Sequence, residues 1–181
     1  MALTPSAMIE LGTKMPVFQL PDTIGNTIGN RGYHGTPVLV AFWCNHCPYV
    51  IHVQDRFVEL ARQWEGKGLG VVAINSNDVT THPEDSPERM LERAQEAGYT
   101  FPYLFDETQE IARSFGATCT PDFFLYDSSH TLVYRGQFDD TRPGGGNPTG
   151  ADLNAAVEAL LGGQEIPEDQ IPSAGCNIKW K

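Results

Sequence analysis

One stretch in the first third of the chain, residues 37–50, constrains the fold more than any other. It begins with an apolar, largely β-branched run over 37–43, which predicts a strand buried on both faces of a sheet. Near its end is Pro48. Proline favours the first position of a helix, where its missing N–H would be unpaired in any case. Between strand and helix lie Cys44 and Cys47, spaced Cys-x-x-Cys. The stretch therefore places two thiols at a helix start.

Two thiols at the N-terminus of a helix have a defined chemistry. The unpaired N–H groups and the dipole of the helix stabilise a thiolate, and the thiolate is the reactive form of cysteine. His46 lies between the two cysteines. When protonated it would add positive charge near the sulfurs, lower a thiol pKa and make a disulfide more oxidising. The stretch thus predicts a redox centre.

Length and charge narrow the class of protein. The 181 residues predict a single domain, 1–181, with a core of its own. With 12 Lys and Arg against 23 Asp and Glu, the net charge of −11 argues against nucleic acid and anionic membranes as partners. Residues 1–10 carry no secretory signal, and no apolar run approaches the roughly 18 residues of a membrane helix. We therefore expect a cytoplasmic protein, in which cysteines are usually reduced, catalytic or bound to metal.

The rest of the hydrophobic pattern predicts an α/β domain. A strand, an amphipathic helix and a second strand follow one another from residue 38 to residue 74, so the two strands should be parallel with a right-handed crossover. Turn-rich sequence precedes them, and a hairpin follows near the end. Expected strands are 17–20, 69–74, 101–105, 122–126 and 131–138, and expected helices are 48–65, 87–97, 108–115 and 151–161, the last with a capping box at Thr149 and Asp152.

Three motifs then support a family resemblance. They are Cys-Asn-His-Cys-Pro-Tyr-Val over 44–50, Cys-Thr-Pro-Asp-Phe-Phe over 119–124, and Gly-Cys-Asn-Ile-Lys-Trp-Lys over 175–181. With them the chain resembles the redoxin branch (alkyl hydroperoxide reductase/thiol-specific antioxidant) of the thioredoxin-like superfamily, and within it a peroxiredoxin-like subgroup. The resemblance implies a thioredoxin-like α/β fold: a central mixed β-sheet flanked by helices, an N-terminal β extension, and a C-terminal tail, 164–181, packed on the domain.

The resemblance also assigns roles to the cysteines. Thioredoxin-like reductases carry the nucleophilic cysteine where Cys47 stands, followed by Pro48. In the peroxiredoxin pattern Pro-x-x-x-Thr-x-x-Cys, the threonine position is then Cys44, and with Cys44 as the reactive cysteine it is Ala41. Either way, the hydroxyl that would bind a peroxide is missing. We therefore expect Cys47 to be the more acidic thiolate and Cys44 to close the disulfide.

Five further residues are considered for the predicted site or its surroundings. The resemblance implies a cis peptide between Thr120 and Pro121 beside the dithiol, with Pro121 shaping the substrate groove. Cys119 then lies near the site, and it serves either a redox role or simple packing. Cys176, on the tail, either forms a disulfide with Cys119 or with the active pair, or packs the tail down. Arg142 is expected to be a solvated loop residue rather than an anion partner.

The predicted reaction is thiol–disulfide exchange with a protein or small-molecule thiol, supported by a reductant system and needing no cofactor. One alternative is a divergent peroxidase, in which Cys47 becomes a sulfenic acid that condenses with Cys44. Another is a non-catalytic thiol protein that binds a partner or a metal. Cys44, His46 and Cys47 would then be ligands, with Cys119 as a fourth, but no second cluster has ligand spacing. The sequence leaves these alternatives open.

Overall fold

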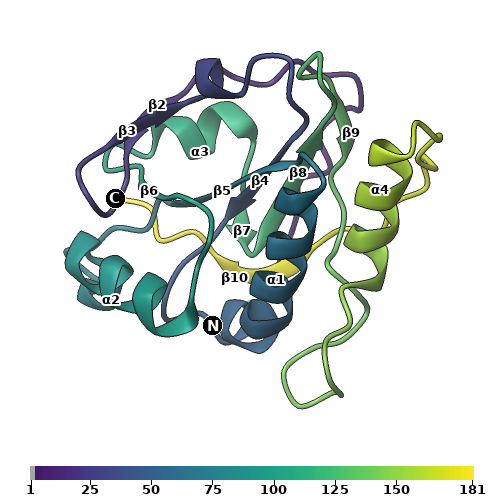
Figure 1. Ribbon diagram of the computed structural model, residues 1–181. Helices are drawn as coiled ribbons and strands as arrows, with labels where there is room; N and C mark the ends of the chain where they lie inside the picture. Colours follow the sequence, from purple (N-terminus) through teal and green to yellow (C-terminus); the bar gives the residue numbers. More distant parts are fainter. Residues whose placement is uncertain (1–2) are drawn as a thin grey trace.

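The computed structural model describes residues 3–181 and has a five-stranded mixed sheet at its centre (Figure 1). The strand order is β6-β5-β4-β8-β9. The first three strands are parallel, β8 is antiparallel to β4, and β9 is antiparallel to β8. The strands are β4 (Val38–Phe42), β5 (Gly70–Asn75), β6 (Tyr103–Phe105), β8 (Asp122–Tyr126) and β9 (Leu132–Tyr134).

Helices cover both faces of this sheet (Figure 1). Side chains of α1 (Pro48–Gly66), α2 (Pro87–Ala97) and α4 (Ala151–Leu161) share one hydrophobic cluster, and α3 (Glu110–Phe115) belongs to the other. Two short 3-10 helices, η1 (Asn30–Tyr33) and η2 (Pro83–Asp85), lie in loops. The three long helices start and end within a residue of the positions predicted from periodicity and capping. The flanked mixed sheet predicted from the sequence is thus confirmed.

The central strand β4 is buried on both faces, as its apolar run predicts. Leu39 and Ala41 contribute to the cluster beneath α1, and Val38, Val40 and Phe42 contribute to the cluster beneath α3. All five residues are fully buried. Successive side chains of a strand alternate between faces, so only a continuous apolar run satisfies both. This burial fixes where β4 ends, and therefore where the cysteine loop begins.

The start of α4 differs from the sequence prediction. The residue before the helix is Gly150 with φ +71°, and Asp152 accepts a hydrogen bond from Gln137 instead of closing a capping box with Thr149. A Cβ at Gly150 would lie 2.5 Å from Leu60 Cδ1 of α1. The close approach of α4 to α1 therefore needs glycine at this position, and this tertiary contact overrides the local capping signal.

Two smaller sheets complete the molecule. The N-terminal β extension is the hairpin of β2 (Gln19–Pro21) and β3 (Thr27–Gly29). In the other sheet, β10 (Ala174–Asn177) lies between β1 (Leu3–Pro5) and β7 (Cys119–Thr120). Figure 1 shows β10 in yellow, passing beside the first turns of α1. The sequence predicts a docked tail here, but it does not predict that the tail is a strand.

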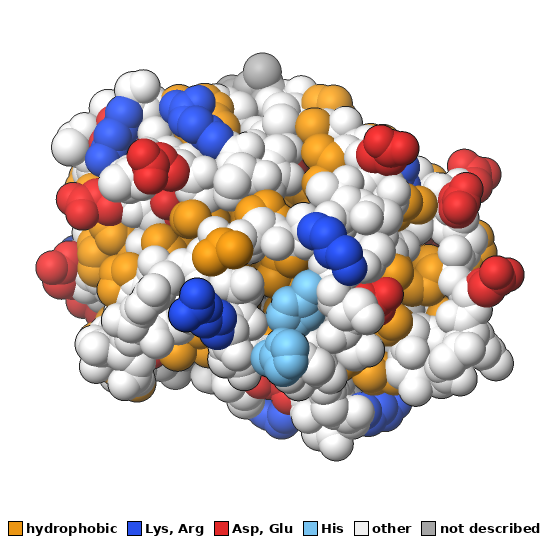
Figure 2. Space-filling view, turned by 90° about the horizontal axis from the view of Figure 1, so that it is seen from above, with side chains coloured by type: hydrophobic (Ala, Val, Ile, Leu, Met, Phe, Trp, Pro, Cys, Tyr) orange, Lys and Arg blue, Asp and Glu red, His pale blue; other side chains and the backbone are white. Residues whose placement is uncertain are grey.

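The surface carries mixed charges. On the face shown in Figure 2, Lys and Arg side chains are scattered among acidic ones and do not gather into a patch. A basic stripe of the kind that binds nucleic acid is therefore missing from this face. No helix within residues 3–181 combines the length and the apolar character needed to cross a membrane.

Candidate active site

Cys47 occupies the position directly before the first turn of α1. Its backbone is extended, with φ −69° and ψ 124°, and Pro48 follows at the first helical position. The carbonyl of Cys47 accepts hydrogen bonds from the N–H groups of Val50 and Ile51, both at 3.0 Å. The residue is fully buried. The strand–loop–helix signal of the sequence thus places the sulfur where the N–H groups of a helix end are concentrated.

The Cys47 sulfur has three hydrogen-bonding neighbours. It lies 2.7 Å from the Sγ of Cys176 and 3.4 Å from the carbonyl oxygen of Thr120. A hydrogen bond with the Cys44 thiol is the largest influence, and it lowers the pKa of Cys47 to about 5 against the opposing effect of burial. The Cys176 thiol and the N–H of Val50 lower this pKa further. Cys47 is therefore a thiolate at neutral pH.

Cys44 has the opposite character, although it lies in the same loop. Its side chain is buried, and its sulfur lies 3.4 Å from the hydroxyl of Thr120. Burial, then the hydrogen bond with Cys47 and the charge of Asp85, raise the pKa of the Cys44 thiol well above its ordinary value. Cys44 therefore keeps its proton and supplies it to a hydrogen bond with the Cys47 thiolate. The two cysteines have the unequal acidities that the sequence predicts for them.

A buried carboxylate organises the loop between the two cysteines. Asp85 is fully buried, and it accepts hydrogen bonds from the backbone N–H of Asn45 at 2.7 Å and from the Asn77 side chain at 2.8 Å. It also pairs with Nδ1 of His46 at 2.6 Å. Burial opposes ionisation, but the bonds from His46, Asn77 and Asn45 together lower the pKa of Asp85. Asp85 is thus a charged group that fixes the Cys-Asn-His-Cys loop.

The surroundings of His46 favour its protonated form. The hydrogen bond to Asp85 raises the pKa of His46, and the charge of Cys47 adds to the same effect. Its ring stacks on the ring of His82, with centroids 4.9 Å apart. Its Nε2 atom is buried and has no hydrogen-bond partner within the described part of the chain. His46 therefore has one nitrogen fixed by the loop and one free to interact with a bound group.

Sequence reasoning missed Asp85 and His82. Neither residue is assigned to the site in the sequence analysis above. A signal was available, because Asn75, Asn77 and their neighbours directly follow a buried strand parallel to β4. The carboxyl ends of parallel strands meet at one edge of a sheet, where ligands commonly bind. The polar side chains after β5 accordingly lie beside the loop after β4.

The strand-entry proline lies where the resemblance placed it. The peptide bond between Thr120 and Pro121 is cis. The Thr120 hydroxyl contacts the Cys44 sulfur, and the Thr120 carbonyl oxygen contacts the Cys47 sulfur. The prediction that this step lies beside the dithiol is thus in agreement with the coordinates.

Cys119 and Arg142 do not contact the cysteine pair. Cys119 is fully buried, and its sulfur contacts the carbonyl oxygen of Pro121 at 3.6 Å. Burial and then the adjacent Asp122 carboxylate raise the pKa of Cys119. Arg142 donates to the carbonyl of Asp139 and to the side chain of Gln137, all within its own loop segment. The expectation that Arg142 is a loop residue agrees with these contacts.

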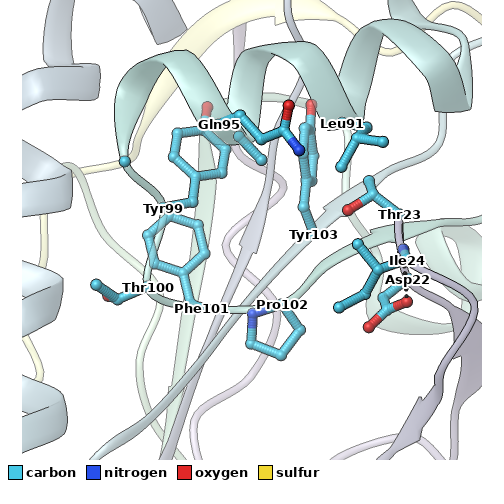
Figure 3. A pocket seen from close by; sticks show the side chains of 12 residues that line it. Asp22, Thr23, Ile24, Leu91, Gln95, Tyr99, Thr100, Phe101, Pro102 and Tyr103 are labelled. Atoms are coloured by element: carbon cyan, nitrogen blue, oxygen red, sulfur yellow. Dashed lines mark hydrogen bonds between the residues drawn. The ribbon is translucent and has the colours of Figure 1, made fainter.

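Two hollows flank the cysteine loop. One, of about 620 Å³, is lined by Asn45, His46, Arg89 and Arg93 among others. The second, of about 490 Å³, lies between α2 and the segment after it, as Figure 3 shows. Aromatic side chains that line it form hydrogen bonds with residues in and next to the cysteine loop. The Tyr99 hydroxyl accepts a hydrogen bond from the Trp43 indole and the Tyr103 hydroxyl donates to the Asn45 side chain.

Metal-ligating groups also come together at the loop. Cys44, His46 and Asp85 each offer one ligand atom, and these atoms lie within 4.8 Å of one another. Thiolate, imidazole and carboxylate are ligands that zinc accepts. The set differs from the one considered from sequence, because Asp85 replaces Cys47 and Cys119. Asp85 is already committed to three hydrogen bonds, so this cluster is explained as a positioning network.

Comparison with known proteins supports this reading of the fold. The family model of the AhpC/TSA family matches residues 11–135. The crystal structure of an uncharacterized conserved protein from Geobacillus kaustophilus is 49% identical, with a TM-score of 0.97 over 100% of this chain and 97% of that chain.

Two curated relatives carry functional names. A Mycobacterium tuberculosis protein classed provisionally as a peroxiredoxin is 29% identical over 116 residues, which is 64% of this chain and 69% of its own length. The thiol-disulfide oxidoreductase ResA of Geobacillus thermodenitrificans is 25% identical over 126 residues, which is 70% of this chain and 68% of its own length. The predicted redoxin resemblance and the thioredoxin-like fold are thereby confirmed. The chain is an oxidoreductase of the thioredoxin-like superfamily and belongs to the AhpC/TSA family.

Proposed function

We propose that this chain catalyses thiol–disulfide exchange with Cys47 as the nucleophile and Cys44 as a resolving thiol. The observation that supports this most directly is the environment of the Cys47 sulfur at the start of α1. A cysteine whose pKa is about 5 is ionised at neutral pH, while its neighbour Cys44 remains a thiol. Exchange needs one attacking thiolate and one thiol that follows it.

The reaction begins when the Cys47 thiolate attacks a disulfide of the exchange partner. A mixed disulfide forms between Cys47 and one partner sulfur, and the other partner sulfur leaves as a thiolate and takes a proton. Cys44 then loses its proton, and its sulfur attacks the Sγ of Cys47. The bond between the two cysteines forms as the mixed disulfide breaks. Two electrons pass from the cysteine pair to the partner, and an external thiol reductant restores the dithiol.

The positive charge of His46 favours the thiolate form in this scheme. Its pKa is raised by Asp85, so His46 carries more charge near neutral pH than an ordinary histidine. A charge that stabilises the reduced, ionised form makes the corresponding disulfide a stronger oxidant. Asp85 and His46 are therefore positioning residues that tune the couple and hold the loop.

Burial sets a condition on the reaction. The exposed fraction of Cys47 is 0%, and that of Cys44 is 1%. A partner therefore reaches the sulfur only after neighbouring residues move aside. We therefore expect Cys47 to exchange more slowly than an exposed thiolate of the same pKa. The rate should depend on how often the residues around Cys47 open to solvent.

A peroxidase is the second candidate, and the provisional peroxiredoxin classification of the Mycobacterium tuberculosis relative favours it. Here the Cys47 thiolate would be oxidised by a hydroperoxide to a sulfenic acid, which condenses with Cys44 with loss of water. The hydroxyl nearest to the pair is that of Thr120, and it contacts Cys44 instead of Cys47. We therefore place exchange first.

Three assays on the purified chain separate the candidates. We expect it to accelerate the reduction of insulin by dithiothreitol, and to consume hydrogen peroxide slowly in the presence of the same reductant. Peroxide consumption without insulin reduction would favour the peroxidase. Stoichiometric zinc or copper after purification, with neither activity, would favour the metal-binding alternative and overturn the proposal.

A further inference from the structure

The sulfur of Cys176, on the C-terminal strand, lies closer to Cys47 than a van der Waals contact between sulfurs allows. The two Sγ atoms are 2.7 Å apart, and a disulfide bond joins sulfurs at about 2.05 Å. We propose that Cys176 forms a disulfide with Cys47, so that this chain has two alternative resolving thiols, Cys44 and Cys176, which share one nucleophile. This inference rests on the proposed function and names a second covalent state of the same centre.

The backbone fixes the position of Cys176. In the three-stranded sheet, Cys176 lies opposite Thr120 of β7 on one side and opposite Leu3 of β1 on the other. Residues directly opposite in an antiparallel pair project to the same face of the sheet. The side chains of Cys176 and Thr120 therefore point to the same side, where the Cys176 sulfur contacts Cys47 and the Thr120 hydroxyl contacts Cys44.

Gly175 makes this close approach possible. A Cβ at this position would lie 1.9 Å from the carbonyl oxygen of Thr120. No side chain fits in that space, so β10 can lie this near to β7 only with glycine before Cys176. The contact between the sulfurs is therefore built into the strand pairing and does not depend on the rotamer of an exposed tail.

The other cysteines lack this relation to Cys47. Cys119 is in the neighbouring strand and equally buried, but its sulfur faces the carbonyl of Pro121. Cys44 has a hydrogen bond with Cys47, while its sulfur is also engaged by the Thr120 hydroxyl. Cys176 thus presents a sulfur to Cys47 from a separate element, the strand β10.

The charges around Cys176 suit a resolving thiol. Burial, then the hydrogen bond with Cys47 and its charge, raise the pKa of Cys176 to about 12, so it remains protonated in the resting state. Once Cys47 is part of a mixed disulfide, it no longer carries the charge that opposes ionisation of Cys176. The pKa of Cys176 then falls, and Lys179 favours the thiolate. Formation of the mixed disulfide thereby makes Cys176 easier to ionise and so more reactive as the resolving cysteine.

The proposed step balances as follows. The Cys47 thiolate attacks a disulfide of the exchange partner and releases one partner sulfur, which takes the proton that Cys176 gives up. The Cys176 sulfur attacks Cys47, and the bond between them forms as the mixed disulfide breaks. The second partner sulfur leaves and takes a proton from water. The partner disulfide gains two electrons, which the two cysteines supply.

Peptide mapping tests whether Cys176 and Cys47 form a disulfide, because the full chain is oxidised while it is folded and is digested only afterwards. The reduced full chain is oxidised with oxidised glutathione, free thiols are blocked with N-ethylmaleimide, and the protein is cut with trypsin under non-reducing conditions. Cys44 and Cys47 stay together on peptide 32–56, Cys176 is on 136–179, and Cys119 is on 114–135. A disulfide between Cys44 and Cys47 is therefore internal to one peptide, and one to Cys176 joins two peptides.

We expect peptides 32–56 and 136–179 to be joined in wild type, in Cys44→Ser and in the control Cys119→Ser. The Cys44→Ser result identifies Cys47 as the partner, and Cys176→Ser should lose the joined product. Oxidation that gives only the internal disulfide of 32–56, with no joined peptides in Cys44→Ser, overturns the inference and leaves the proposed function intact. Absence of any disulfide on Cys47 in every variant overturns both.

Discussion

The start of α1 and the short strand β7 each hold a fully buried cysteine, and the two differ in ionisation. Cys47 and Cys119 are both 0% exposed. Burial raises the pKa of a thiol at both positions. At Cys47, hydrogen bonds led by the Cys44 thiol reverse this effect and bring the pKa to about 5. At Cys119, the carboxylate of Asp122 adds to burial and the pKa rises instead.

The difference shows that the hydrogen-bond donors around the sulfur, and not the degree of burial, decide whether a buried thiol is reactive. Cys47 is surrounded by groups that give a hydrogen bond to a sulfur anion: two thiols and a backbone N–H of a helix end. The backbone N–H of Cys119 is instead hydrogen-bonded to the carboxylate of Asp122, and the charge of Asp122 opposes ionisation of the Cys119 thiol. The same burial therefore yields a nucleophile in one region and an inert packing residue in the other.

The largest expected effect is on catalysis, and it separates the two cysteines directly. Cys47→Ser should reduce insulin reduction to the rate of dithiothreitol alone, because serine cannot form the mixed disulfide. Cys119→Ser, a matched substitution at equal burial, should stay close to wild type. Steady-state turbidity assays measure both rates. Loss of activity in Cys119→Ser, with the fold intact by circular dichroism, would contradict the contrast.

A pH-dependent effect should appear on the Cys119 side. Burial raises the pKa of Asp122 from 3.8 to about 7. A carboxyl group with a raised folded pKa favours the folded state below pH 4, and this stability is lost as the pH rises to 7. Asp122→Asn does not ionise, so from pH 4 to pH 8 its stability relative to wild type should rise by up to about 4 kcal/mol.

Urea unfolding at a series of pH values measures this change. The exposed Asp140, changed to asparagine in the same way, serves as the control and should show no comparable trend. A stability difference between wild type and Asp122→Asn that does not vary with pH would show that Asp122 is ionised as readily as an ordinary aspartate. Burial would then not control the ionisation of the carboxyl group next to Cys119.

A smaller loss of stability is expected on the Cys47 side, at the carboxylate that holds the loop. Asp85→Asn should lower the free energy of unfolding by about 2–3 kcal/mol, because three hydrogen bonds to a buried charged group are weakened. It should also slow exchange, since His46 loses the partner that raises its pKa. Glu84→Gln, at the exposed neighbouring residue, is the control. Equal effects of both substitutions would remove Asp85 from the account.

The smallest expected effect tests the approach of β10. Gly175→Ala should cost about 1–3 kcal/mol of stability, because the new methyl group meets the carbonyl of Thr120 and the strand must shift. The shift withdraws Cys176, so the pKa of Cys47 should rise. Gly66→Ala is the control, because a Cβ there meets no atom within 4 Å. An unchanged reactivity of Cys47 in Gly175→Ala would mean that Cys176 contributes little.

Local sequence patterns were enough for the sheet, the long helices and the dithiol. The buried run of β4 and the helix-starting Pro48 are signals carried within a few residues. The pairing of β10 with β1 and β7 was not predictable, because these strands are short and are brought together from both ends of the chain. Long-range pairings of this kind leave no periodicity in the sequence.

The part of the site that lies within one short segment was predictable in the same way. Cys47 and Cys44 follow from spacing and from the family resemblance. The buried carboxylate of Asp85 and the contact with Cys176 depend on segments that meet the loop only in the folded chain. Cys44, three residues away, has the largest influence on the pKa of Cys47, whereas Cys176 and Asp85 reach the loop only through the fold. Cys-x-x-Cys alone therefore gives the reaction class but not the full environment of the thiolate.

The pH dependence of alkylation, resolved for each cysteine, tests the central claim most directly. The reduced protein is treated with a limiting amount of iodoacetamide at pH 4 to 10, and tandem mass spectrometry of the tryptic peptides separates Cys44 from Cys47. We predict that modification of Cys47 rises with a midpoint at about pH 5 and is constant by pH 7, while Cys119 stays unmodified throughout. A midpoint near pH 9 for Cys47, the ordinary value of a thiol, would contradict the account.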